Sequence, residues 1–185
     1  PDVERAAQWL IEAMTRIGMT ARAYQADGYL PIVYGEWLGA GADKPTVLVY
    51  GHYDVQPAQQ SDGWLTDPFT PTERDGKLYA RGAVDSKSHV LIQLKAVESL
   101  LLTGGAPVNI KLMFEGEEES GSAHIFKFVA DNPDLLRCDV CVVSDGSLPD
   151  VNQPVLDYGL RGLAPSMELI VTGPQRDLHS GHYGG

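Results

Sequence analysis

Long apolar runs, cysteine and basic charge are all scarce in this sequence of 185 residues. No apolar run approaches the ~20 residues that a membrane-spanning helix needs, so we expect no membrane partner. The 14 Lys and Arg residues stand against 25 Asp and Glu, and the net charge is −11. Without a basic patch, nucleic acid is not an expected partner either. The N-terminus has no initiator Met and no signal-peptide pattern, so we expect that the chain begins part-way through a longer protein.

The two cysteines, Cys138 and Cys141, are spaced C-x-x-C, a pattern found in redox sites and in half of a zinc knuckle. No second C-x-x-C completes a knuckle, and the apolar residues around Cys141 favour a buried strand. We therefore expect both thiols to be reduced and buried. A reduced pair is typical of the cytoplasm, which is the predicted location.

Apolar and turn-forming residues follow one another in an order typical of an α/β fold. Apolar residues at helical spacing predict helices over residues 2–17, 88–102 and 123–130. Runs of β-favouring residues predict strands over 20–24, 32–38, 46–50, 77–80, 108–114 and 140–143. A long polar loop is expected over 56–76. Because helices separate the buried strands, we predict a three-layer α/β sandwich with a mixed, largely parallel central sheet.

The predicted strand that starts at Thr46 is followed at once by His52 and Asp54. In an extended chain, residues two apart point to the same side. Sites of α/β proteins lie beyond the carboxyl ends of their strands. By itself, however, such a pair is more typical of a hydrogen-bonded couple at a strand end than of a functional site.

Acids gather near the ends of other predicted elements, at Asp85, Glu118, Glu119 and Asp145. They could form a solvated acidic face or a site that holds cations. If they converge with His52, their mutual repulsion raises their pKa values, and a pair of divalent cations would relieve it. Mixed His and carboxylate ligands suit Zn²⁺, Mn²⁺ or Co²⁺ better than Ca²⁺, which takes oxygen ligands only.

Two such metals, ~3.5–4 Å apart, can share a bridging carboxylate and activate a water molecule. The adjacent Glu118 and Glu119 offer one ligand and one base. Residue types alone leave open which acid does which.

Four motifs follow one another along the chain: Gly51-His52-Tyr53-Asp54-Val55-Gln56-Pro57, Arg81-Gly82-Ala83-Val84-Asp85-Ser86-Lys87, Glu115-Gly116-Glu117-Glu118-Glu119-Ser120-Gly121-Ser122 and Asp177-Leu178-His179-Ser180-Gly181. In this order they resemble the motifs of the M20 metallopeptidases. These are co-catalytic zinc hydrolases that include carnosinase-like dipeptidases, glutamate carboxypeptidases and N-acyl amino acid deacylases. The resemblance spans the chain from Gly51 to its end. Three segments look most like the dipeptidase branch: Val55-Gln56-Pro57, Asp62-Gly63-Trp64 and Tyr158-Gly159-Leu160-Arg161-Gly162.

The resemblance implies a zinc-peptidase-like sandwich that binds two divalent metal ions, with Zn²⁺ favoured and Mn²⁺ or Co²⁺ as alternatives. His52 and Asp145 would ligate one ion, Glu119 would ligate the other, and Asp85 would bridge both. The resemblance also implies a cis peptide bond between Asp85 and Ser86.

It implies catalytic roles for Asp54, Glu118 and His179. Asp54 would orient His52, and Glu118 would be the general base for the bridging water. His179 would extend into the active site of a partner subunit and stabilise the tetrahedral oxyanion there. A homodimer formed through the lid domain is therefore expected.

The sequence departs from the family pattern in two places. Ser88 replaces the usual Gly after the bridging motif, and we expect it to cap the following helix. The last metal-ligating His of the family belongs to a longer chain. We therefore expect residues 1–158 to be the N-terminal segment of the catalytic domain and 159–185 the start of a smaller α+β lid and dimerisation domain. His89 and His124 are expected on helix surfaces or caps, and His182 beside the His179 turn, none of them as ligands.

The predicted function is metal-dependent hydrolysis of a peptide bond in dipeptides or short peptides. One alternative is an N-acyl amino acid deacylase with the same metal centre. Another is a non-catalytic fragment whose carboxylates hold no metal. We expect the 185 residues alone to hold at most one well-occupied metal and to be inactive.

Overall fold

The computed structural model describes residues 1–146, 150, 153, 155 and 169–170. The described residues up to Gly146 belong to one compact unit, and the later ones to a second unit. His179, His182 and the predicted lid segment, apart from residues 169–170, lie outside the described residues, as does the boundary predicted at 158. No helix in the described part of the chain is long and apolar enough to cross a membrane.

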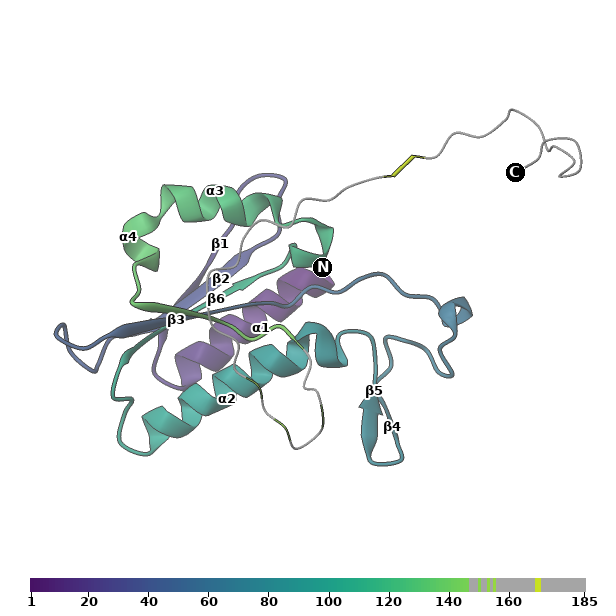
Figure 1. Ribbon diagram of the computed structural model, residues 1–185, viewed down its shortest axis with the longest axis horizontal. Helices are drawn as coiled ribbons and strands as arrows, with labels where there is room; N and C mark the ends of the chain where they lie inside the picture. Colours follow the sequence, from purple (N-terminus) through teal and green to yellow (C-terminus); the bar gives the residue numbers. More distant parts are fainter. Residues whose placement is uncertain (147–149, 151–152, 154, 156–168, 171–185) are drawn as a thin grey trace, which may run out of the picture. The chain divides into compact units, whose positions relative to one another are not determined.

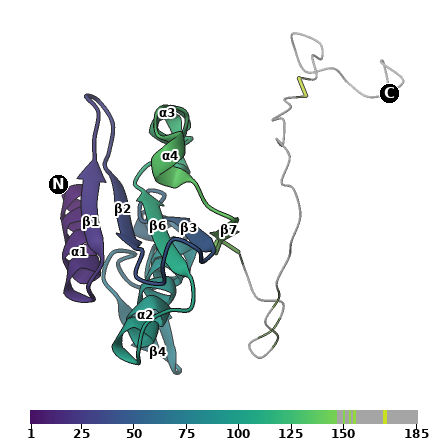
Figure 2. The ribbon, with the colours of Figure 1, turned by 90° about the vertical axis from the view of Figure 1, so that its left-hand side faces the viewer.

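A mixed sheet of five strands forms the centre of the first unit, in the order β1-β2-β6-β3-β7 (Figure 2). Strand β3 runs parallel to both β6 and β7, whereas β2 runs antiparallel to β1 and β6. The sheet is therefore mixed, as predicted, and its parallel part is the one whose strands end in polar residues. The strands are β1 (Thr20–Tyr24), β2 (Ile32–Trp37), β3 (Thr46–His52), β6 (Asn109–Glu115) and β7 (Val140–Val143).

Helices cover both faces of this sheet, which confirms the predicted sandwich (Figure 1). Helices α1 (Asp2–Arg16) and α2 (His89–Leu102) pack on one face, and α3 (Ala123–Asp131) and α4 (Pro133–Leu136) pack on the other. The two-residue period of β6 sends Leu112 and Phe114 toward α1 and α2, and Met113 toward α3. Each face of the strand thus contributes to a separate apolar core.

A small hairpin combines the strand predicted over 77–80 with a strand that we did not predict, which lies in the stretch expected to be a polar loop. It consists of β4 (Thr72–Arg74) and β5 (Lys77–Tyr79), joined by Asp75 and Gly76. Both turn residues have positive φ, at 52° and 69°. Asp-Gly is a preferred pair for this kind of two-residue turn, so the signal was present in the sequence. A short helical turn, Gln60–Asp62, lies in the same stretch.

Two local expectations were wrong. Ser88 stands at the N-cap position of α2, but its side chain makes no capping hydrogen bond, because the irregular helical segment Ala83–Ser88 runs directly into that helix. The Ser88 hydroxyl instead donates to the carbonyl oxygen of Val84. Cys138 and Cys141 are free thiols, but Cys138 is only half-buried and Cys141 is exposed. The reason is that Cys141 lies on β7, an outer strand of the described sheet whose residues are mostly exposed.

We predict that Leu112→Ala lowers the free energy of unfolding by about 2–5 kcal/mol. The Leu112 side chain is 0% exposed, so its removal leaves a cavity in the core. Leu102→Ala is the matched control, since Leu102 is 76% exposed and should cost little. Urea denaturation of both variants measures the difference. Equal effects of the two substitutions would contradict the packing described here.

Candidate metal centre

His52 lies at the carboxyl end of β3, where the parallel part of the sheet ends. Its side chain is completely buried, and in the strand register it is paired with Glu115 of β6. Asp85 comes from the irregular helical segment before α2, and Asp145 lies two residues beyond β7. Three separate stretches of the chain therefore place their polar side chains at one edge of the sheet.

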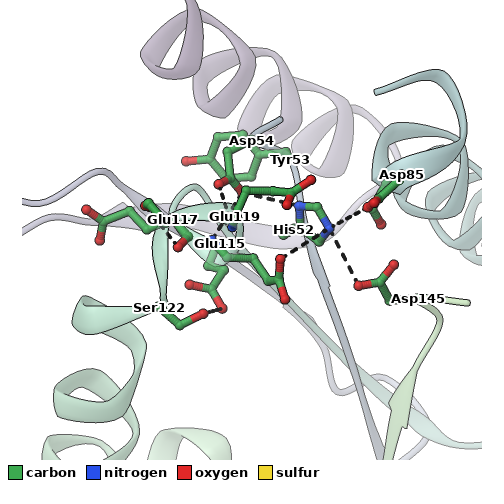
Figure 3. Close-up of polar contacts among 12 residues, drawn as sticks. His52, Tyr53, Asp54, Asp85, Glu115, Glu117, Glu119, Ser122 and Asp145 are labelled. Carbon is green, nitrogen blue, oxygen red and sulfur yellow. Dashed lines mark hydrogen bonds and ion pairs between the residues drawn. The ribbon is translucent and has the colours of Figure 1, made fainter. Parts of the chain in front are cut away.

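His52, Asp85 and Asp145 form the one group among the described residues whose ligand atoms could hold a metal ion, with those atoms all within 4.8 Å of one another. The Nε2 atom of His52 lies 3.0 Å from Asp85 Oδ1 and 3.5 Å from Asp145 Oδ2 (Figure 3). Two ligand atoms of a tetrahedral zinc ion are about 3.3 Å apart, given metal–ligand distances of about 2.0–2.1 Å. One imidazole nitrogen and two carboxylates thus fit a divalent transition metal.

Asp54 makes three contacts around this group. Its Oδ1 atom lies 3.2 Å from His52 Nδ1, on the far side of the ring from the two acids. The backbone N–H of Glu118 donates to Oδ1 at 3.3 Å, and that of Glu119 donates to Oδ2 at 3.0 Å. A proton held on Nδ1 by Asp54 leaves the lone pair of Nε2 free for a metal.

Glu118 and Glu119 sit differently, although they are neighbours in the sequence. Glu118 Oε2 lies 3.9 Å from His52 Nε2, so this carboxylate joins the edge of the group. Glu119 Oε2 accepts a hydrogen bond from Gln56 Nε2 at 3.0 Å. The structure therefore brings together three of the four predicted ligands, and Glu119 is not among them.

The crowding of acids changes the pKa values of the site. Burial alone would lower the pKa of His52, but the hydrogen bond to Asp54 and the charges of Asp54, Asp145 and Glu118 together raise it to about 9. Burial acts to raise the pKa of Asp54, yet its bonds to His52 and to the Glu119 amide lower it overall. Burial, together with the charge of Asp145, raises the pKa of Glu118. In the absence of metal, a proton on His52 therefore balances part of the negative charge.

The peptide bond between Asp85 and Ser86 is cis, as the resemblance implied. Ser86 is completely buried, and its hydroxyl lies 3.5 Å from the Nδ1 atom of His89.

One of the two helix histidines lies where we expected it, and the other does not. His89 is the first residue of α2, which is an end position of a helix, as expected. Its Nδ1 atom is 3.9 Å from Asp145 Oδ1, so it also lies at the rim of the candidate centre. His124 is buried, stacks on Tyr29 and has its Nδ1 atom 3.2 Å from the Leu30 carbonyl oxygen. It belongs to the core and not to a helix surface.

A second polar cluster, which we did not predict, holds the loop that carries Glu118. Glu115 is 1% exposed, and its side chain lies beside Ser122, whose hydroxyl donates to Glu115 Oε1 (Figure 3). The same oxygen also accepts a hydrogen bond from the hydroxyl of Tyr50. Burial raises the pKa of Glu115. The contacts join both ends of the segment 115–122 to each other and to β3.

Comparison with known proteins decides the family. The model of "Peptidase family M20/M25/M40" matches residues 48–172, which is more than half of the chain. The chain belongs to this family. The match includes His52, Asp85 and Asp145 as well as the segment that carries Glu118.

Several relatives in this family are dipeptidases. The chain is 46% identical to the "Beta-Ala-His dipeptidase" of Mus musculus over 84% of its own length and 32% of the relative. It is 37% identical to the "Cys-Gly metallodipeptidase dug1" of Schizosaccharomyces pombe over its whole length and 41% of the relative. The chain therefore spans about a third to two fifths of these relatives.

Solved structures of M20 relatives share the fold. Human carnosine dipeptidase 1 superimposes with a TM-score of 0.70 at 38% identity, over 78% of this chain and 33% of that one. The dipeptidase Dug1p of Saccharomyces cerevisiae gives a TM-score of 0.74 at 31% identity, over 84% of this chain and 36% of that one. The sandwich is therefore the α/β fold of this peptidase family.

We predict that His52 makes the stability of the metal-free protein depend on pH. Its folded pKa of about 9 lies above the ordinary value of 6.5. The stabilisation is therefore fully present below about pH 6.5 and is lost as the pH rises through about 9. Protonated His52 contributes on the order of 3 kcal/mol to the free energy of unfolding in this way.

Urea denaturation of the EDTA-treated protein and of His52→Gln, from pH 6 to pH 10, measures this effect. The difference in unfolding free energy between the two proteins should shrink as the pH rises. A difference that stays constant or grows would show that the acids do not act on His52 as described.

Proposed function

We propose that the whole protein hydrolyses a peptide bond in dipeptides or short peptides, at a divalent metal centre. The observation that carries this proposal is the convergence of His52, Asp85 and Asp145, with Glu118 at their edge, in a chain of this peptidase family. The relatives described above are dipeptidases, which favours a peptide substrate over an N-acyl amino acid.

His52, Asp85 and Asp145 would hold one metal ion, and Asp85 would share its carboxylate with a second ion ligated by Glu119. Asp85 suits a bridging role because its side chain is 63% exposed and has room on its open side. The ions, for which we favour Zn²⁺ over Mn²⁺ or Co²⁺, would lower the pKa of a water molecule and polarise the substrate carbonyl.

Glu118 would act as the general base. Its carboxylate accepts the proton of the attacking water and afterwards returns it to the amine that leaves. Burial and the neighbouring acids raise the pKa of Glu118, which moves it toward the range in which a base works near neutral pH. Asp54 keeps His52 in one orientation and one tautomer through its contact with Nδ1.

His179, in the segment predicted to begin the lid, would stabilise the oxyanion in the site of a partner subunit. We infer a homodimer on this ground. We also infer a cytoplasmic location, because the two cysteines are free and one of them is exposed.

We predict that Glu118→Gln, in the whole protein, keeps its metal and loses hydrolysis by about 10²–10⁴-fold, because the amide keeps the shape of the side chain and removes the base. Dipeptide hydrolysis and metal content by atomic absorption measure the two effects. Glu117→Gln, in the same acidic run, is the control and should retain activity. Loss of metal from Glu118→Gln would mean that Glu118 is a ligand and that the base lies elsewhere.

We further predict that two inactive variants complement each other. Whole protein carrying His179→Ala, mixed with whole protein carrying Glu118→Gln, forms hybrid dimers with one intact site. Some dipeptidase activity should return after subunit exchange, which fluorescence energy transfer between labelled subunits can establish. Proven exchange without recovery would show that His179 does not act across the dimer.

A further inference from the structure

Three residues of the chain that leaves β3 are hydrogen-bonded to the acidic segment after β6. The backbone N–H of Tyr53 donates to the Glu115 carbonyl oxygen at 2.9 Å. The carboxylate of Asp54 then accepts hydrogen bonds from the backbone N–H groups of Glu118 and Glu119. Gln56, two residues further on, reaches Glu119 with its side chain. Glu119 is therefore held from two positions, Asp54 and Gln56.

We propose that Gln56 is a positioning residue that fixes the carboxylate of Glu119 for metal binding. Its Nε2 atom donates to the Glu119 carbonyl oxygen at 2.8 Å and to Glu119 Oε2 at 3.0 Å. This inference rests on the proposed function, in which Glu119 ligates the second ion. It explains how a residue outside the group of His52, Asp85 and Asp145 is kept ready for that role.

The contacts of Glu119 leave one ligand atom available. Its backbone N–H is bound by Asp54, while its carbonyl oxygen and its Oε2 atom are bound by Gln56. Within the described part of the chain, Oε1 has no hydrogen-bond or ion-pair partner. One carboxylate oxygen is thus held in place and the other is left for a metal.

A glutamine suits this position because its amide donates without carrying a charge. A Lys or Arg at position 56 would neutralise the Glu119 carboxylate that the metal needs. An Asp or Glu at position 56 would repel that carboxylate. The amide orientation follows from chemistry, because both atoms that it meets on Glu119 are acceptors, so the nitrogen must face them. Fixing the side chain beforehand also removes an entropy cost from metal binding.

Metal titration of the whole protein tests the proposal without an activity assay. Apo protein is titrated with Co²⁺, and calorimetry and visible absorption give a dissociation constant for each ion. Glu119→Gln identifies the step that depends on Glu119. Gln56→Ala should weaken that same step about 10–100-fold and leave the other step unchanged, as expected for a residue that orients a ligand. Gln56→Glu should weaken it at least as much.

Gln60→Ala is the matched control, since Gln60 is an exposed glutamine in the same loop whose side chain makes no hydrogen bond with the described residues. It should leave both dissociation constants unchanged. Melting temperatures of the apo proteins verify that all variants fold.

Two results would overturn the proposal, and they differ in what they say about function. If Glu119→Gln weakens one step and Gln56→Ala weakens neither, Gln56 has no positioning role while the metal centre stands. If Glu119→Gln itself changes neither step, Glu119 is not a ligand and the two-metal assignment falls with the proposal. Equal weakening of both steps by Gln56→Ala would show a general structural effect, and that also contradicts it.

Discussion

The carboxylate of Asp54 is the interaction on which the arrangement of this site depends. It is buried, it binds the imidazole of His52, and it accepts the backbone N–H groups of both Glu118 and Glu119. A buried carboxylate is costly unless its oxygens are satisfied, and these contacts satisfy both. The same contacts connect the end of β3 to the segment after β6. Asp54 therefore sets the ring orientation of His52 and the place of the acidic segment at once.

Around Asp54, several carboxylates surround the single imidazole of His52. Asp85 and Asp145 face the Nε2 side of His52 while Asp54 faces its Nδ1 side. The hydrogen bond to Asp54 and the charges of Asp54, Asp145 and Glu118 raise the pKa of His52 to about 9. The proton on His52 and a divalent cation are two ways to balance the same charge. Metal binding must displace that proton, so binding is expected to release protons at neutral pH. The depressed pKa of Asp54 keeps this carboxylate charged in either state.

The strands and the convergent acids were predictable because each leaves a local signal. The run from Thr46 into His52 and Asp54, and the acids near the ends of later elements, indicate a strand-end site in an α/β fold. Contacts between side chains far apart in sequence leave no such signal, and this applies to the bond from Gln56 to Glu119 and to the Tyr50–Glu115–Ser122 cluster. The missing cap at Ser88 was not predictable, because helix propensity says nothing of the irregular segment that precedes α2. The exposure of Cys141 depends on what lies beside β7, which an apolar run does not reveal.

The most direct test of the account is a crystal structure of the zinc-loaded whole protein, with anomalous data collected at the zinc edge. The account predicts an anomalous peak bonded to His52 Nε2, Asp85 and Asp145, with Asp54 still bound to the imidazole and to the two backbone N–H groups. A peak bonded instead to His89 without His52, or the absence of any peak at this edge of the sheet in protein that retains zinc, would contradict it.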